Sequence, residues 1–418
     1  MRQDDTVPNE MRALLLDGIG FDHLAVRTVP VPRPGPEQLL ARVDAAGICT
    51  SLLKLIAQGP DHRLVNGWDV TRFPLILGDE GSVTVLEVGE KLAGSFRLGQ
   101  RCVLQPAVDH PPVNHPERYR DGGRGMAKVA VGYTLPGHLA EYVLITEEAI
   151  RAGCVIPLPD ASLPFAHAAI SEPISCCVSS QDHHLHLVQD GPNAPRSTVK
   201  GLRPGGVTVV IGAGAMGRMH VDVAMSAGPR AIVAADLVPE RLHRVEHLFA
   251  GQARMKGITL RTVNVEQEEL KAIIDDLTDR RGADDVIVAV GSREVVESAP
   301  ALCGRGAVLD LFGGLKRGED RVALDTGIVH YREINVTGSS GGSPWDIRWT
   351  LELMAAGEVR TAAHITRVGD LDHAPDLLRM IERRELDGKA VVYPHRRTDH
   401  ILTVEQWTAE DEREYLGG

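Results

Sequence analysis

The feature that most constrains this chain is a glycine motif that directly follows a short β-branched run. The run spans Val207 to Ile211, and the motif Gly212-Ala-Gly-Ala-Met-Gly217 follows it. A run of this kind is typical of a buried parallel strand. In G-x-G-x-x-G the first glycine makes a tight turn, the second lets the backbone approach a pyrophosphate, and the third lets a helix pack on the strand. The segment therefore predicts the strand, turn and helix of a dinucleotide-binding fold.

The surroundings of the motif indicate which dinucleotide binds. A second apolar run, 231–235, ends at Asp236, about 20 residues after Gly214, where the ribose 2′-hydroxyl is usually held. A carboxylate there repels a 2′-phosphate, and no arginine directly follows it, which favours NAD(H) over NADP(H). Asp236 could instead cap the helix that starts near Pro239. The predicted cofactor-binding residues, including two glycines that end further strands, are Gly212, Gly214, Ala215, Met216, Gly217, Asp236, Gly291 and Gly313.

Length and composition narrow the class of protein. A chain of 418 residues is long for one core and suggests two domains. A net charge of −12 without a dense basic cluster disfavours nucleic acid or an anionic membrane as a partner. No apolar run is long enough to span a bilayer, and the polar first ten residues do not resemble a signal peptide. The six cysteines are scattered without C-x-x-C, so we expect a reducing, cytoplasmic location.

The hydrophobic pattern changes along the chain. Residues 11–150 carry short alternating runs broken by Gly and Pro, which is an all-β pattern, whereas strands and helices alternate from about 200. We therefore expect an α/β protein with domains at 1–177, 178–340 and 341–418, the last returning to the first. The segment 109–128 is predicted to be a long loop. Predicted strands cover 12–16, 39–43, 82–88, 101–104, 139–145, 262–265, 286–290 and 307–312, and predicted helices cover 239–249, 266–279 and 293–303.

Several strings resemble the medium-chain dehydrogenase/reductase superfamily over nearly the whole chain. The resemblance is carried by Gly47-Ile-Cys-Thr-Ser51, Leu75-Ile-Leu-Gly-Asp-Glu-Gly81, Gly137-His-Leu-Ala-Glu-Tyr-Val143 and Ser171-Glu-Pro173. Within the superfamily, Gly99-Gln-Arg-Cys-Val-Leu-Gln-Pro-Ala107, Glu172-Pro-Ile-Ser-Cys-Cys177 and Val336-Thr-Gly-Ser-Ser-Gly-Gly342 look most like the L-sorbose-1-phosphate reductase branch. The resemblance implies a GroES-like β-barrel catalytic domain and a Rossmann domain with a doubly wound parallel sheet.

The resemblance also implies a site and a reaction. Cys49 and Glu172 would be ligands of a catalytic Zn²⁺, Glu80 would lie beside the metal, and Ser51 would relay the substrate proton. The expected reaction is hydride transfer between nicotinamide and a secondary alcohol or ketone of a polyol, sugar, sugar phosphate or cyclitol. Relatives of this kind form dimers or tetramers, so we expect a homodimer or homotetramer, with the strand near 336–338 at the interface.

The main departure from the family is Asp79, which stands where a histidine ligand is usual. An aspartate oxygen can bind zinc, but a carboxylate in place of an imidazole makes the metal a poorer Lewis acid and shifts its preference toward other divalent ions. Asp79 could instead cap a turn in a site that binds no metal. Two alternatives therefore stay open: a zinc-free reductase of the quinone or enoyl type, and a non-catalytic NAD(H)-binding sensor or scaffold.

The resemblance also bears on the stretch 105–142, where members of the family often carry four cysteines that bind a structural zinc. This chain has no cysteine there, so no structural zinc is expected. The arginines of this stretch, Arg118, Arg120 and Arg124, are candidate phosphate ligands if the substrate is phosphorylated, or members of a solvated loop. The cluster 183–186 (His-His-Leu-His) is interpreted as a helix with histidines on mixed faces and not as a metal site.

Overall fold

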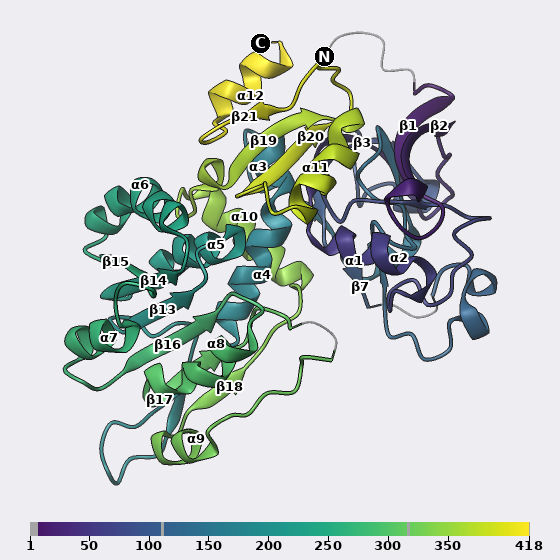
Figure 1. Cartoon of the computed structure of the whole chain (residues 1–418). Coiled ribbons are helices and arrows are strands. Elements are labelled where there is room, and N and C mark those ends of the chain that lie inside the picture. The colour runs from purple at the N-terminus through teal and green to yellow at the C-terminus, as the bar shows by residue number, and fades with distance from the viewer. Residues whose placement is uncertain (1–6, 110–112, 316–317, 418) are drawn as a thin grey trace. The chain divides into compact units, whose positions relative to one another are not determined.

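The structure is a computed structural model that describes residues 7–109, 113–315 and 318–417. The first six residues of the polar N-terminal segment lie outside the described residues. The chain divides into two compact units, drawn in Figure 1. The first unit comprises Met1–Glu172, Ser343–Ala355 and Thr361–Gly418, and the second comprises Pro173–Gly342 and Ala356–Arg360.

The first unit is built around a largely antiparallel sheet with β3 (Leu39–Ile48) near its centre. β3 pairs antiparallel with β5 (Glu80–Val88) and with β20 (Lys389–Tyr393), so the C-terminal segment completes a sheet begun by the N-terminal half. The strand order is β10-β6-β5-β3-β20-β19-β21, and β9 also pairs with β3. The remaining strands of this unit are β1 (Glu10–Leu16), β2 (Leu24–Pro30), β4 (Leu75–Ile76), β6 (Arg101–Leu104), β7 (Ala107–Val108), β8 (Val129–Ala130), β9 (Tyr142–Ile145), β10 (Val155–Pro157), β19 (Ile365–Asp370) and β21 (Leu402–Thr403).

Short helices close the core of the first unit. In α11 (Ala374–Glu382), Ala374, Leu377 and Leu378 are buried in the main hydrophobic cluster, because residues three and four apart share one helix face. The other helices of this unit are α1 (Ser51–Gln58), α2 (Glu147–Arg151), α3 (Phe165–Ala169), α10 (Pro344–Ala355) and α12 (Ala409–Leu416), and α4 (Ser171–Asp182) begins here and continues into the second unit.

The second unit contains the predicted parallel sheet, in the order β15-β14-β13-β16-β17-β18. Every residue of β13 (Val207–Ile211) is buried, as its β-branched run predicts. β13 pairs with both β14 and β16, so the strand order reverses at this point, as in a doubly wound fold. Figure 1 shows α5 and α6 on one side of the sheet and α7 to α9 on the other. The bounds are β14 (Ala231–Asp236), β15 (Thr259–Asn264), β16 (Ala283–Val288), β17 (Cys303–Asp310), β18 (Asn335–Thr337), α5 (Ala215–Ala224), α6 (Pro239–Met255), α7 (Leu270–Thr278), α8 (Arg293–Ser298) and α9 (Thr326–Arg332).

The predicted helical segment near 293–303 is confirmed as α8, which ends at Ser298, followed directly by a 3-10 helix at Ala299–Leu302, before Cys303 begins β17. Pro300 lacks the N–H that a continuing α-helix needs. One prediction about local structure was wrong, because the histidine cluster is not helical. α4 ends at Asp182, and the next residues enter β11 (Leu185–Val188), which pairs with β12 (Ser197–Lys200). The alternation in β11 is the reverse of the usual one, with leucines exposed and histidines buried.

The predicted long loop over 109–128 is confirmed for the residues that the structure describes there, which exclude 110–112. They contain short 3-10 turns at Pro116–Arg118 and Arg120–Gly123. No helix among the described residues is both long and apolar enough to cross a membrane.

The C-terminal helix α12 is held to the first unit by one buried carboxylate. Glu412 accepts hydrogen bonds from the backbone N–H groups of Phe165 (2.6 Å) and Ala166 (2.8 Å) and from the hydroxyl of Tyr393 (2.7 Å). The two N–H groups belong to the first residues of α3, which have no acceptor within their own helix. Glu412 therefore caps α3 from a position about 250 residues later in the chain.

We predict that Glu412→Ala destabilises the first unit by about 2–3 kcal/mol, because three buried donors lose their acceptor. Thermal and urea unfolding of the variant would measure this loss. Glu410→Ala, at an exposed position of the same helix, is the matched control and should unfold like the wild type. Equal stability of the two variants would contradict the capping role of Glu412.

Candidate active site

The pairing of β3 with β5 brings three predicted site residues together. Gly47 is opposite Glu80 in the register, Cys49 directly follows β3, and Asp79 directly precedes β5. One donor atom from each of Cys49, Asp79 and Glu80 lies within 4.8 Å of the others. Two residues interpreted as ligands, Cys49 and Asp79, are therefore neighbours in space, and Glu80 is a direct member of the same cluster.

The two carboxylates of this cluster have unpaired oxygens. Among the described residues, Asp79 Oδ1 and Glu80 Oε2 are buried without a hydrogen-bond partner. Gly47 is required beside them, because a Cβ at this position would lie 2.1 Å from Glu80 Oε2. Unpaired buried oxygens are costly, and a bound cation would satisfy both of them. One sulfur and two carboxylate oxygens form a donor set that fits a divalent transition metal.

Lys389 balances part of this negative charge and was not predicted from the sequence. It is the first residue of β20, and its Nζ lies 2.5 Å from Glu80 Oε1 and 3.3 Å from the carbonyl oxygen of Ile48. Burial lowers the pKa of Lys389, but the carboxylate of Glu80 and the other anionic groups raise it above its ordinary value. The only signal in the sequence was a lysine at the start of an apolar run, and its partner became apparent only when β20 was paired with β3.

The electrostatics of the cluster oppose a free thiolate. Burial, and then the carboxylates of Asp79 and Glu80, raise the pKa of Cys49 well above its ordinary value. A divalent cation would reverse this effect, because a coordinating thiol loses its proton. The three side chains are therefore mutually unfavourable as anions and become compatible when they share a cation.

Glu172, which the family resemblance implies as a third ligand or a nearby carboxylate, lies outside the group of three close donor atoms. It is the second residue of α4. Its carboxylate still contributes to the raised pKa of Cys49, so it lies within electrostatic range of that thiol. The structure thus places Glu172 near the cluster, and its role as a third ligand stays a prediction.

Ser51 forms a hydroxyl link to the cluster. It begins α1, and its Oγ donates a hydrogen bond to Asp79 Oδ2 at 2.7 Å. The phenol of Tyr133 interacts with Ser51 in turn. Burial, followed by the carboxylate of Asp79, raises the pKa of Tyr133, so this hydroxyl is neutral at physiological pH. Tyr133 lies in a Gly-Tyr-Thr segment without a recognisable motif, which is why sequence reasoning missed it.

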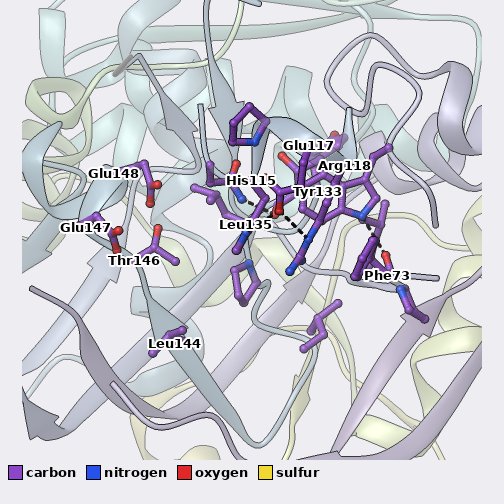
Figure 2. A pocket seen from close by; sticks show the side chains of 18 of the residues that line it. Phe73, His115, Glu117, Arg118, Tyr133, Leu135, Leu144, Thr146, Glu147 and Glu148 are labelled. Carbon is purple, nitrogen blue, oxygen red and sulfur yellow. Dashed lines mark hydrogen bonds and ion pairs between the residues drawn. The ribbon is translucent and has the colours of Figure 1, made fainter. Parts of the chain in front are cut away.

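Tyr133 also lines a cavity of about 660 Å³ in the first unit, shown in Figure 2. Arg118 contributes to its wall, with its guanidinium 4.1 Å from the ring centroid of Phe73. The other two arginines of the predicted loop have different partners. Arg120 pairs with Asp61 at 3.0 Å, and Nε of Arg124 donates to the carbonyl of Asp121. Only Arg118 of the three is therefore a wall residue of this cavity.

The glycine motif in the second unit has the geometry that its sequence predicts. Gly212 has φ of 103°, a left-handed conformation that favours glycine. A Cβ on Gly217 would lie 1.7 Å from the carbonyl oxygen of Gly212, whereas a Cβ on Gly214 would meet nothing within 4 Å. The open space at Gly214 leaves the backbone approachable, and α5 begins directly afterwards with Ala215 and Met216. This arrangement can accept a pyrophosphate at the helix N-terminus.

Asp236 ends β14, as predicted, and its two oxygens are already engaged in this structure. Oδ2 accepts from the N–H of Ala213 (2.7 Å), and Oδ1 accepts from the N–H of Val238 (2.9 Å). Arg241 lies nearby, with Nη1 3.7 Å from Asp236 Oδ2. Sequence reasoning excluded an arginine directly after the acid, but the first turn of α6 brings one back beside it. Asp236 therefore braces the glycine loop, and its contact with ribose stays a prediction.

The two remaining predicted glycines lie beside one another at the carboxyl edge of the sheet. Gly291 follows β16 and Gly313 follows β17. A Cβ on Gly291 would lie 2.7 Å from the carbonyl oxygen of Gly314, and one on Gly313 would lie 2.5 Å from the backbone of Val290. The two loops can approach this closely because Gly291 and Gly313 have no side chains. Open α/β sheets bind their ligands at this edge.

Comparison with known proteins agrees with both units. Residues 35–160 match the alcohol dehydrogenase GroES-like domain, and residues 215–356 match the zinc-binding dehydrogenase family. A mannitol-1-phosphate 5-dehydrogenase of Aliivibrio fischeri is 33% identical over 384 residues, which is 90% of this chain and 85% of that protein. The chain belongs to the zinc-binding branch of the medium-chain dehydrogenase/reductase superfamily. The expected family and fold class are thereby confirmed.

The chain is also similar to two further proteins. An L-sorbose 1-phosphate reductase of Klebsiella pneumoniae is 27% identical, over 85% of this chain and 82% of that protein. Among solved structures, a Sinorhizobium meliloti protein of the zinc-binding dehydrogenase type, bound to NADP, superposes with a TM-score of 0.71 at 24% identity. This match covers 93% of this chain and all of that one, and it supports the fold.

We predict that Gly217→Ala weakens NADH binding by about ten-fold or more, equivalent to about 1.4 kcal/mol, because the new Cβ displaces the loop that accepts the pyrophosphate. Fluorescence titration with NADH would measure the change. Gly251→Ala is the control, since its Cβ would meet nothing within 4 Å inside α6, and it should bind NADH normally. Unchanged NADH affinity of Gly217→Ala would refute the assignment of this loop.

Proposed function

We propose that this protein is an NAD(H)-dependent dehydrogenase that transfers a hydride between nicotinamide and a secondary alcohol or ketone of a polyol, sugar, sugar phosphate or cyclitol. The observation that carries the proposal is the buried Cys49–Asp79–Glu80 cluster with its unpaired carboxylate oxygens. Membership of a dehydrogenase family and the geometry of the glycine loop support the redox half of the reaction. The names of the relatives, which include polyol and sugar-phosphate enzymes, support the substrate class.

We further propose that Cys49, Asp79 and Glu172 hold a divalent metal, with Glu80 beside it. Such a cation would supply Lewis-acid polarisation of the substrate oxygen. The residues of the chain provide the remaining functions. Lys389 neutralises Glu80, and Ser51 is placed to accept or donate the substrate proton because its hydroxyl can do both. Tyr133 forms a second hydrogen bond with the Ser51 hydroxyl and would help to orient it.

The two alternatives have less support from the site. A zinc-free reductase of the same fold would have no use for two unpaired buried carboxylate oxygens beside a thiol. A non-catalytic sensor would need the glycine loop, but it would give the hydrogen bond between Ser51 and Asp79 no role. Both alternatives predict a protein without bound metal at Cys49, so metal content separates them from the proposed enzyme.

Our first test is the metal content of the purified protein, measured by elemental mass spectrometry. We expect Cys49→Ala and Asp79→Asn each to lose about one zinc or other divalent ion per chain and to lower kcat by at least about 100-fold, the scale of removing transition-state charge stabilisation. Cys154→Ala removes another buried cysteine of the same unit and should keep both metal and activity. Activity would be assayed on polyols, their 1-phosphates and cyclitols. Full activity of Cys49→Ala would instead favour the zinc-free reductase.

Cofactor preference provides a second test. We expect Asp236→Asn to weaken NAD(H) binding about ten-fold, because one charged acceptor for the ribose hydroxyls is lost, and to affect NADP(H) less. Arg241→Gln is the matched variant, and it should leave NAD(H) binding unchanged. Equal weakening of both cofactors by Asp236→Asn would indicate that Asp236 only braces the loop through Ala213.

We also propose that the protein works in the cytoplasm as a homodimer or homotetramer. The support for assembly is β18, which forms an edge of the six-stranded sheet and leaves Val336 42% exposed. An open edge strand with an apolar side chain can pair with a second copy. Light scattering of the purified protein would measure the assembly, and a monomer would exclude it.

A further inference from the structure

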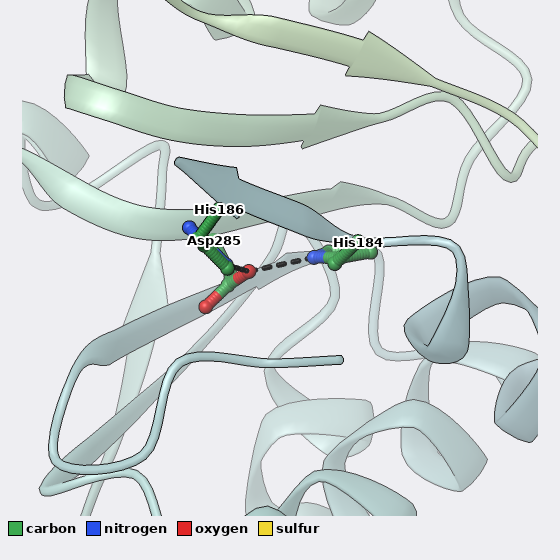
Figure 3. Close-up of side chains that lie close together, drawn as sticks. All are labelled: His184, His186 and Asp285. Atoms are coloured by element: carbon green, nitrogen blue, oxygen red, sulfur yellow. Dashed lines mark hydrogen bonds and ion pairs between the residues drawn. The ribbon is translucent and has the colours of Figure 1, made fainter. Parts of the chain in front are cut away.

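The second unit contains a second cluster of possible ligands, far along the chain from the first. His184, His186 and Asp285 converge as shown in Figure 3. Asp285 Oδ1 lies 2.6 Å from Nδ1 of His184 and 2.9 Å from Nε2 of His186. All three side chains are at most 1% exposed. They come from the entry to β11 and from β16, and none belongs to the glycine loop or to the predicted cofactor contacts.

The outer atom of each ligand also has a partner. Nε2 of His184 lies 3.3 Å from Asp310 Oδ2, which the hydroxyl of Ser180 also contacts. Nδ1 of His186 lies 3.4 Å from the carbonyl oxygen of Gly306. Asp285 Oδ2 accepts the N–H of Arg203 at 2.9 Å. Histidines that bind metals usually orient their second nitrogen in this way, toward a carboxylate or a backbone carbonyl.

A proton count shows that this cluster needs positive charge. All four ring nitrogens of the two histidines face an oxygen acceptor, but a neutral imidazole carries only one N–H. Two neutral rings therefore carry two N–H groups for four acceptor contacts. Protonation of both rings would supply the two missing protons, and one divalent cation bound by His184 Nδ1, His186 Nε2 and Asp285 Oδ1 would replace them. In either state the charge balances the two carboxylates of Asp285 and Asp310.

We propose that His184, His186 and Asp285 form a second metal site, which binds a divalent transition metal such as Zn²⁺ in exchange for two protons. Two imidazoles and one carboxylate suit such ions, and three protein ligands leave a fourth position for water. Ligand atoms around tetrahedral zinc lie about 3.3 Å apart, so Asp285 Oδ1, now 2.6 and 2.9 Å from the two ring nitrogens, must draw back by about 0.5 Å. Because the three ligands are completely buried, the ion would hold β11 and β16 together and would not be reached by a substrate.

The competing occupant is a pair of protons. Burial disfavours a charged His184, but its hydrogen bonds to Asp285 and Asp310 raise its pKa to about 9. Burial raises the pKa of Asp285, but its hydrogen bonds with His184 and His186 lower it to about 2. Protons can therefore hold the network together at neutral pH, and a metal must displace them to bind. The two states differ in metal content and in bound protons, so both can be measured.

The experiment compares four full-length proteins unfolded in chelator and refolded with or without zinc. We expect about two zinc ions per chain in the wild type, about one in Cys49→Ala, about one in His186→Gln and about two in His183→Gln. His183 is the matched control because it is exposed and lies outside the cluster. Refolding metal-free Cys49→Ala with zinc should also release about two protons relative to refolding it without zinc, because only the metal-free folded network binds them; a pH indicator measures the difference. This second measurement does not depend on whether His186→Gln folds.

The outcomes separate this proposal from the metal site at Cys49. One zinc ion that persists in Cys49→Ala and disappears in His186→Gln would support the second site and contradict the first. One zinc ion that disappears in Cys49→Ala and persists in His186→Gln would overturn the second site and leave a network held by protons. No zinc in Cys49→Ala, together with no proton release, would overturn it as well.

Discussion

The pairing of β3 with both β5 and β20 is the interaction on which the proposed chemistry depends. It places Cys49 beside the Asp79–Glu80 pair on one side and delivers Lys389 on the other. These residues are separated by up to about 340 positions in the chain. A shift of one residue in either register would turn alternate side chains to the opposite face of the sheet and disperse the cluster. The C-terminal segment is therefore part of the site as much as of the fold.

Buried charge is handled differently in the two units. In the first unit, three acidic groups meet one lysine, and two carboxylate oxygens have no partner among the described residues. In the second unit, two carboxylates meet two imidazoles, and every ring nitrogen faces an oxygen. In the first arrangement one lysine faces three acidic groups, and burial raises the pKa of Cys49, Asp79 and Glu80, so either protons or an added cation must supply the remaining positive charge. The second arrangement can be neutral with protons alone, so a metal ion must displace protons from the histidine nitrogens in order to bind.

The sequence predicted those features that depend on local pattern. The β-branched run and glycine spacing identified β13, its turn and α5 with correct bounds for the strand, and the strings around Cys49 and Asp79 named all three residues of the Cys49–Asp79–Glu80 cluster. Lys389, Tyr133 and Arg241 were missed, because each reaches its partner through tertiary structure or a helical turn that no short motif encodes. The helix predicted over 183–186 was wrong, because β11 buries His186 and exposes Leu185 and Leu187, which inverts the usual hydrophobic rule.

The aspartate at position 79 has a consequence beyond the metal. A histidine ligand is neutral and cannot accept a hydrogen bond with the nitrogen that binds the ion. Asp79 has two oxygens, so Oδ1 can face the cluster while Oδ2 accepts a hydrogen bond from the Ser51 hydroxyl at 2.7 Å. The proposed ligand and the proposed proton carrier are thus joined directly. This link ties the orientation of the Ser51 hydroxyl to the ligand, and the interaction with Tyr133 gives the hydroxyl a second partner. Exchange of Asp79 for histidine would therefore alter proton transfer together with metal affinity.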